Sequence, residues 1–212
     1  MNTWPLLDRR IALDGWPSAN QKVHVLYEDQ SLLIIDKPAG LLCTAPPGID
    51  SAKALLAQYV RQTETKNGPS DGAQQADRIL LCHRLDRPVS GILVAAKSKK
   101  AAAALSQQFA NRIIEKRYNA LVSVQRASPD TVPEWNAGTE WNDWMRKLPD
   151  AAAAEIVPRQ HADAKHAMLT LQQIQAGHWT RENGFGPPSA DGIPVLRLSI
   201  VLGTGRIWWV RP

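Results

Sequence analysis

Residues 79–96 read ILLCHRLDRPVSGILVAA, and their pattern is the most informative one in the sequence for the fold. Apolar runs at 79–82 and 91–96 enclose a polar connection, a pattern typical of two buried strands joined by a loop. Asp86 lies in that connection, with Arg84 and Arg87 close by and a Ser-Gly turn ahead. From these residues alone, two interpretations of Asp86 stay open. It is either a solvated ion pair worth about 0 to 1 kcal/mol, or a carboxylate that carries chemistry.

The composition is that of a globular protein. The chain has 212 residues, 44% of them hydrophobic, which is enough for a sizeable core and indicates one domain. No apolar run is long enough to cross a bilayer and no signal-peptide pattern opens the chain, so we expect a cytoplasmic protein without a membrane partner. Cys43 and Cys82 lack metal-binding spacing and are predicted to be buried thiols, with no metal site and no disulfide.

The apolar pattern predicts alternating short strands and helices. Further strands are expected at 31–36, 113–124, 166–175 and 193–202, and helices at 51–62 and after Ser98. Lys37 follows the first of these strands in a Lys-Pro-Ala-Gly segment, and we expect a loop to present it. The expected fold class is α+β, with a mainly antiparallel, twisted sheet and flanking helices. Residues 63–77 are predicted to be a surface loop.

Residues 125–165 show no clear period. This segment contains Trp135, Trp141 and Trp144. Such tryptophans either pack against a core or stack on bases, and the sequence favours packing.

Positive charge is concentrated in one segment. The net charge is +5, and residues 78–117 hold nine Lys or Arg against two acidic residues. This segment would attract a polyanion such as nucleic acid. A basic, solvated face explains the charge equally well, so charge alone leaves both interpretations open.

Four segments in order resemble the RluA-type pseudouridine synthases. They are VLYEDQSLLIIDKPAGLL at 25–42, HRLDRPVSGILV at 83–94, EKRYNALV at 115–122 and LGTGRIWWVR at 202–211. The resemblance covers residues 22–211, nearly the whole chain, and it favours the chemical interpretation of Asp86. It implies the twisted mixed sheet of that family's catalytic core over residues 22–212. Residues 1–21 are then an N-terminal extension, too short for a separate RNA-binding domain.

The resemblance implies that the protein isomerises a uridine of structured RNA to pseudouridine without cofactor or metal. Ribosomal RNA is the first expectation for the substrate and transfer RNA the second. The family's catalytic aspartate corresponds to Asp86, which would attack the anomeric carbon or remove a sugar proton; both routes need an ionised carboxylate. Its basic partner corresponds to Arg211. Tyr118 matches the tyrosine that stacks on the target base.

The resemblance also implies substrate-binding residues. Arg84 matches an arginine that fills the space left when the uridine is flipped out of its helix. The other residues assigned to substrate binding or to the floor of the site are Arg87, Lys37, Arg206 and Val210. His83 is expected to be a structural hydrogen-bonding residue, with the role of a base as its alternative.

The sequence departs from the family pattern in two places. Val89 replaces a threonine, which removes a hydroxyl and keeps the shape. Trp208 and Trp209 replace a His-Gln pair, and the chain stops at Pro212, so a C-terminally shortened core is expected. An uncovered edge of the sheet would then favour homo-association. The alternative to an active enzyme is an RNA-binding homologue whose catalysis is impaired by that shortening.

Overall fold

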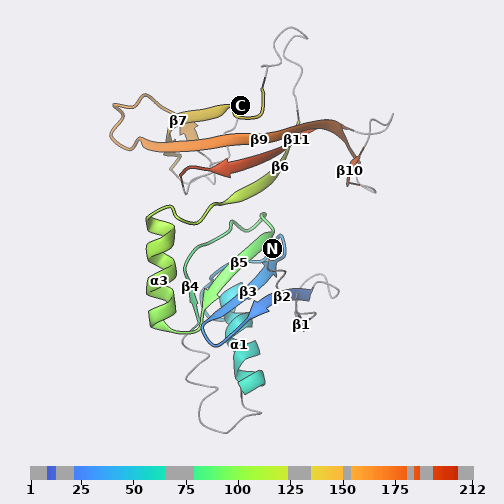
Figure 1. The fold of residues 1–212 in the computed structure, drawn as a ribbon, viewed down its shortest axis with the longest axis vertical. Coiled ribbons are helices and arrows are strands. Elements are labelled where there is room, and N and C mark those ends of the chain that lie inside the picture. Colours follow the sequence, from blue (N-terminus) through green and yellow to red (C-terminus); the bar gives the residue numbers. More distant parts are fainter. Residues whose placement is uncertain are drawn as a thin grey trace. The chain divides into compact units, whose positions relative to one another are not determined.

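The chain divides into two compact units, Met1–Ile113 and Ile114–Pro212. The computed structural model, drawn in Figure 1, describes residues 9–12, 22–64, 79–123, 135–149, 154–180, 184–186 and 193–204. Each unit contains one sheet, and every pairing between named strands is antiparallel. The expected α+β class with antiparallel strands is confirmed. The described strands form two sheets, where the sequence analysis expected one.

The first unit is built on a five-stranded sheet with the order β1-β2-β3-β5-β4. Its strands are β1 (Arg9–Ala12), β2 (Lys22–Glu28), β3 (Leu32–Lys37), β4 (Leu80–Leu81) and β5 (Gly91–Ala96). β1 belongs to the segment that the sequence analysis treated as an extension, and it pairs with β2. The sheet of the first unit therefore begins before residue 22.

Strand β3 shows why Lys37 is buried. Successive side chains of a strand point to opposite faces of the sheet. Leu33, Ile35 and Lys37 share the buried face, and Asp36 is exposed. The expectation that a loop presents Lys37 was therefore wrong: the strand runs one residue further than predicted, and its register turns the lysine inward.

Helix α1 (Ala52–Glu64) begins where the sequence predicted a helix. The Ser51 hydroxyl accepts a hydrogen bond from the Ala54 amide at 3.3 Å, which satisfies one of the unpaired donors of the first turn. The Leu42 and Cys43 carbonyls accept from the Ala52 and Lys53 amides at 2.8 and 3.0 Å. The start of α1 is therefore tied to the segment that follows β3.

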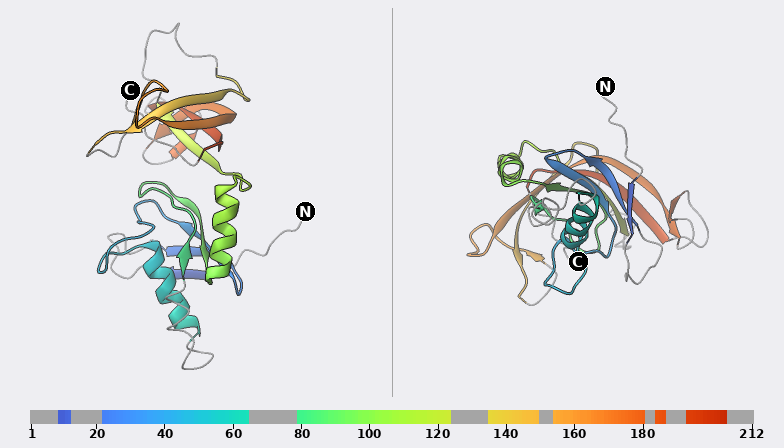
Figure 2. Two further views of the ribbon diagram at one scale, coloured as in Figure 1. Left: turned by 90° about the vertical axis from the view of Figure 1, so that its left-hand side faces the viewer. Right: turned by 90° about the horizontal axis from the view of Figure 1, so that it is seen from below.

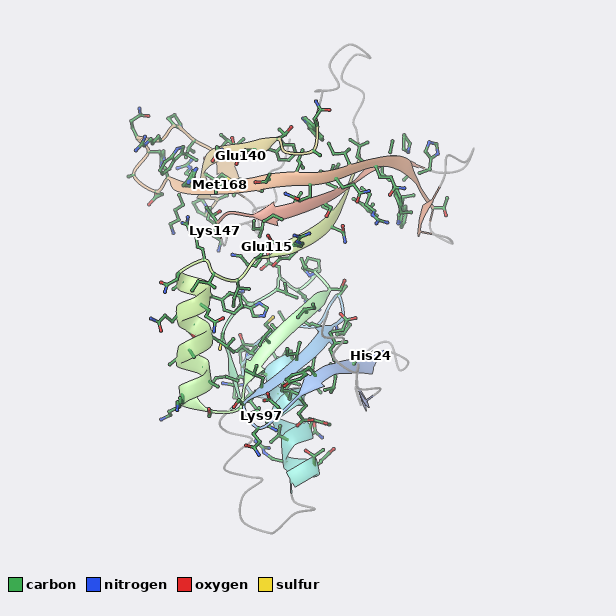
Figure 3. The ribbon with its side chains drawn as sticks, viewed as in Figure 1. His24, Lys97, Glu115, Glu140, Lys147 and Met168 are labelled. Atoms are coloured by element: carbon green, nitrogen blue, oxygen red, sulfur yellow. The ribbon has the colours of Figure 1, made fainter. Side chains whose placement is uncertain are left out.

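A partly buried polar network joins α1 to the sheet. Glu28 on β2 accepts hydrogen bonds from the Lys97 ammonium at 3.0 Å and from the Tyr59 hydroxyl at 2.8 Å. Lys97, labelled in Figure 3, follows β5 directly. The side chains of Lys97 and Glu28 are only 9% and 13% exposed, so water screens the ion pair weakly.

Helix α3 (Lys99–Ala110) runs beside β5 and β4. Ser98 caps it as predicted, because its hydroxyl accepts from the Ala101 amide at 3.1 Å. At the other end, the Arg112 amide donates to the Phe109 carbonyl and the Ile113 amide to the Gln108 carbonyl. These bonds form a Schellman motif, in which Arg112 takes the left-handed position with φ +57°.

The second unit is a six-stranded, twisted sheet (Figure 2) with the order β6-β11-β9-β7-β8, in which β10 pairs with β9. Its strands are β6 (Arg117–Ser123), β7 (Glu140–Lys147), β8 (Ala154–Ile156), β9 (Lys165–Thr180), β10 (Gly184–Gly186) and β11 (Ile193–Leu202). β11 has the predicted bounds. β6 begins four residues later than predicted, because the amide of Ile113 is engaged in the end of α3.

The core of the second unit lies along β9 and β11. Leu171, Leu198, Ile200 and Leu202 are its buried members. Trp135 and Trp141 pack against them, with their ring centroids 4.9 Å apart in an edge-on arrangement. The packing interpretation of these two tryptophans is confirmed. Among the helices that the structure describes, none is both long and apolar enough to span a membrane.

Candidate active site

Asp86 lies in the loop that connects β4 to β5, as the sequence predicted. Its side chain is exposed, whereas the neighbouring Leu85 is 7% exposed. The Asp86 carbonyl accepts from the Val89 amide at 3.0 Å, which closes a turn after the aspartate. Leu85 is therefore buried, whereas the carboxylate of Asp86 is accessible.

Hydrogen bonds to residues 40–43 hold the loop on both sides of Asp86. The Gly40 amide donates to the Arg87 carbonyl at 2.6 Å, and the Arg87 Nε donates to the Gly40 carbonyl at 3.1 Å. On the other side, the Cys43 thiol donates to the Leu85 carbonyl at 3.1 Å, and its sulfur accepts from the Leu85 amide at 3.2 Å. We call these four hydrogen bonds the loop clamp. Gly40 has φ +91°, a conformation that favours glycine.

The ammonium group of Lys37 is buried below this region. Its Nζ donates to the Pro38 and Leu41 carbonyls at 3.0 and 2.8 Å. Both carbonyls lie close in sequence to Gly40 and Cys43, which belong to the loop clamp. Burial lowers the pKa of Lys37 below its ordinary value, and the acidic groups of Cys43 and Asp86 partly oppose that effect. Asp86 is thus within electrostatic reach of Lys37. The two hydrogen bonds tie the lysine to the segment that follows β3.

His83 has the structural role that the sequence favoured. Its Nε2 accepts the backbone amide of Val94 at 2.9 Å, and its ring centroid lies 4.8 Å from that of Phe109. The first contact joins the loop to β5 and the second joins it to α3. An Nε2 that accepts from an amide is engaged in holding the fold, which counts against His83 as a base.

Two predicted substrate-binding arginines flank the aspartate on the exposed side of the loop. Arg84 and Arg87 are both exposed. The Nε of Arg87 donates one of the four hydrogen bonds of the loop clamp, so this side chain has a structural role. Sequence reasoning did not assign that role.

The basic segment 78–117 is partly exposed and partly paired. Lys99, Lys100 and Arg112 are exposed on and beside α3. Lys97 is paired with Glu28, and Arg117 with Glu115. Within the described part of this segment that belongs to the first unit, the exposed basic residues therefore lie on or beside α3 and in the Asp86 loop.

The remaining predicted site residues are not among the described residues of the first unit. Tyr118 belongs to β6 of the second unit, where it is half-buried, pairs with Ile200 and packs against the core. Arg206, Val210 and Arg211 lie outside the described residues. The first unit therefore brings together Asp86, Arg84, Arg87 and Lys37. In the described part of the chain, no three His, Cys, Asp or Glu side chains gather in a way that could hold a metal ion.

Comparison with known proteins identifies the family to which the chain belongs. Residues 31–210 match the family model described as RNA pseudouridylate synthase, and the chain belongs to this family. The RluA-type resemblance is thereby confirmed. The fold agrees: human RNA Pseudouridylate Synthase Domain Containing 4 superposes with a TM-score of 0.55 over 86% of this chain and 59% of that one, at 19% identity.

Curated relatives match over shorter segments. A tRNA pseudouridine synthase C of Pectobacterium carotovorum is 34% identical over 47% of this chain and 24% of its own length. A ribosomal large subunit pseudouridine synthase C of Haemophilus ducreyi is 33% identical over 50% of this chain and 30% of its own. An RNA pseudouridine synthase of Chlorobaculum parvum is 30% identical over 72% and 44%. The chain thus matches less than half of the length of each of these three relatives.

Proposed function

We propose that this chain isomerises a specific uridine of structured RNA to pseudouridine, with Asp86 as the catalytic carboxylate. The observation that carries the proposal is the presentation of Asp86. Within the family's His-Arg-Leu-Asp motif, its exposed side chain stands between two residues, Leu85 and Arg87, whose backbones the loop clamp holds. A catalytic group held in this way loses little freedom when it meets its substrate.

The reaction is an isomerisation and therefore balances without a co-reactant. The bond between N1 of uracil and C1′ of the ribose breaks, the base rotates, and C5 bonds to C1′. The C5 proton leaves to water and N1 gains a proton. Asp86 serves the first step either by attacking C1′ or by removing a proton from the sugar, and both routes require its ionised form.

Cationic residues lie around Asp86. Lys37 is within electrostatic reach, and Arg84 and Arg87 add positive charge on the exposed side of the loop. We further propose Tyr118 as the residue that stacks on the target base, Arg211 as the basic partner of Asp86, and Arg206 and Val210 as further contacts to the substrate.

Ribosomal RNA is the proposed substrate, with transfer RNA as the second choice. Relatives named for both kinds of RNA match this chain at similar identity. Arg84 is proposed to enter the space that the flipped uridine leaves. Flipping the uridine out of its helix costs a few kcal/mol, and the cost is lowest in loops. An exposed arginine beside the catalytic loop is suited to that role.

The experiment that tests the proposal uses ribosomal and transfer RNA transcripts that carry tritium at C5 of uridine. Turnover releases this tritium to water, because C5 gives up its hydrogen when it bonds to C1′. In the Asp86→Asn variant we expect release to fall by roughly a thousandfold or more, with RNA affinity changed by no more than about threefold. Asp36→Asn, which alters another exposed carboxylate of the same unit, is the matched control and should stay fully active.

Two results would contradict the proposal. Turnover retained by Asp86→Asn would remove Asp86 from the chemistry. Tight RNA binding by the unaltered protein without any tritium release, on either class of transcript, would favour the RNA-binding homologue.

A further inference from the structure

We propose that Cys43 is a positioning residue for the reaction, because its sulfur fixes the backbone immediately before Asp86. The inference rests on the proposed function and adds to it a residue that the family motifs do not include. Cys43 is 6% exposed and lies 42 residues before Leu85 in the sequence. No local pattern links the two residues.

The contact between Cys43 and Leu85 is reciprocal. The thiol donates to the Leu85 carbonyl at 3.1 Å, and the sulfur accepts from the Leu85 amide at 3.2 Å. One side chain thus satisfies both polar groups of a buried backbone unit, as a neighbouring strand would. Both distances lie within hydrogen-bond range for sulfur, so one side chain holds residue 85 at two points.

Cys43 is itself held firmly. Its carbonyl accepts from the Lys53 amide at 3.0 Å in the first turn of α1. The preceding residue, Leu42, forms a parallel bridge with Ser51 and accepts from the Ala52 amide at 2.8 Å. Cys43 therefore links the Asp86 loop to the start of α1.

A cysteine meets the demands of this position. It can donate and accept in the same place, and it is less costly to bury than a hydroxyl. Alanine would leave the amide and carbonyl of Leu85 without this partner in a buried place. The Gly40–Arg87 half of the loop clamp would remain, so the loop would loosen on one side and Asp86 would lose its fixed direction.

Cys82 provides a matched control. It is the other cysteine of the chain, lies in the same unit and is half-buried. Its thiol contacts the Ala102 carbonyl of α3 at 3.6 Å and the Leu80 carbonyl at 3.9 Å, and neither of these belongs to the loop clamp. Cys82→Ala removes the same atoms from the same unit without releasing residue 85.

The test measures turnover by tritium release, at a temperature where circular dichroism shows every variant to be folded. In Cys43→Ala we expect kcat to fall by roughly tenfold to a hundredfold, the loss that an ångström of misplacement can cause, with KM for RNA nearly unchanged. Cys43→Ser, which can still donate and accept, should recover kcat to within about threefold of the unaltered protein. Cys82→Ala should keep full kcat. If Cys43→Ala does not fold, Cys43→Val fills the space without either hydrogen bond and replaces it.

A second readout does not depend on catalysis. Hydrogen exchange of the Leu85 amide should be at least about tenfold faster in Cys43→Ala and unchanged in Cys82→Ala. Unchanged exchange, or a kcat loss shared equally by both alanine variants, would overturn the positioning role. If the unaltered protein shows no turnover, the proposed function fails and the catalytic part of this inference fails with it, while the exchange measurement still decides whether Cys43 holds the loop.

Discussion

The ammonium group of Lys37 is the least expected feature at the scale of single residues. A lysine is rarely fully buried unless it is paired. Here Lys37 is 0% exposed, and two backbone carbonyls accept hydrogen bonds from its ammonium group. Those carbonyls belong to the segment that clamps the Asp86 loop, so the lysine holds this segment together.

The lowered pKa of Lys37 predicts how stability depends on alkaline pH. The group loses its proton at lower pH in the folded state than in the unfolded state, whose pKa is about 10.5. Between those two pKa values the unfolded state binds more protons, so the stability contribution of Lys37 rises with pH there, by at most about 1.4 kcal/mol per pH unit. Urea unfolding of the native protein and of Lys37→Met, compared from pH 7 to 10.5, measures this contribution as a growing difference in favour of the native protein. A difference that does not vary with pH would contradict the assignment.

At the scale of elements, the end of α3 contains a residue in a costly conformation. Arg112 occupies the left-handed position of the Schellman motif, where glycine is usual. A non-glycine residue there carries a cost of about 1 kcal/mol. Its side chain is exposed, beside the other surface cations of α3.

Arg112→Gly should therefore stabilise the protein by about 0.5 to 1 kcal/mol, because glycine adopts this conformation without a steric penalty. Thermal or urea unfolding measures the gain. The neighbouring Asn111 has φ −80°, so Asn111→Gly gains nothing from relief of strain and serves as control. Equal effects of the two changes on stability would argue against strain at Arg112.

The elements also show what the sequence could and could not predict. β5 and β11 have the predicted bounds, since apolar residues between clear turn signals define them. β7 was missed because EWNDWMRK mixes large, charged and amide side chains on both faces, and only Met145 is fully buried. Lys37 was placed in a loop because Pro38 and Gly40, which follow it, are typical of the end of a strand. The position of a residue on a face depends on register, which a sequence does not state.

For the candidate site, local motifs predicted Asp86, the flanking arginines and the structural role of His83. They could not predict the partners that fix the loop. The bond from Arg87 to Gly40 spans 47 residues and that from Cys43 to Leu85 spans 42. Contacts of this kind follow from strand order, which becomes known only with the fold.

At the scale of the whole molecule, charge is the property that concerns RNA. The net charge of +5 is modest, but Arg84, Lys99, Lys100 and Arg112 are exposed on the first unit. RNA phosphates would displace counterions at such a surface, and binding would then weaken as salt concentration rises.

Arg84→Ala and Lys99→Ala should each weaken RNA binding and reduce the slope of log affinity against log salt concentration by about 1. Titrations of the labelled transcripts at several salt concentrations measure this slope. Lys53→Ala, an exposed lysine on α1 outside the basic segment, should leave the slope unchanged. If the slope of all three variants equals that of the native protein, the basic segment is not the RNA footprint.

The long sequence separation within the loop clamp has a consequence for the order of events during folding. Residues 40–43 follow β3 and are synthesised before residues 85–87, which precede β5. We therefore expect the loop clamp to form together with the pairing of β3 and β5, once both segments exist. A nascent or partly unfolded chain would contain every residue of the motif and yet be inactive, so activity during refolding should appear no earlier than completion of this unit.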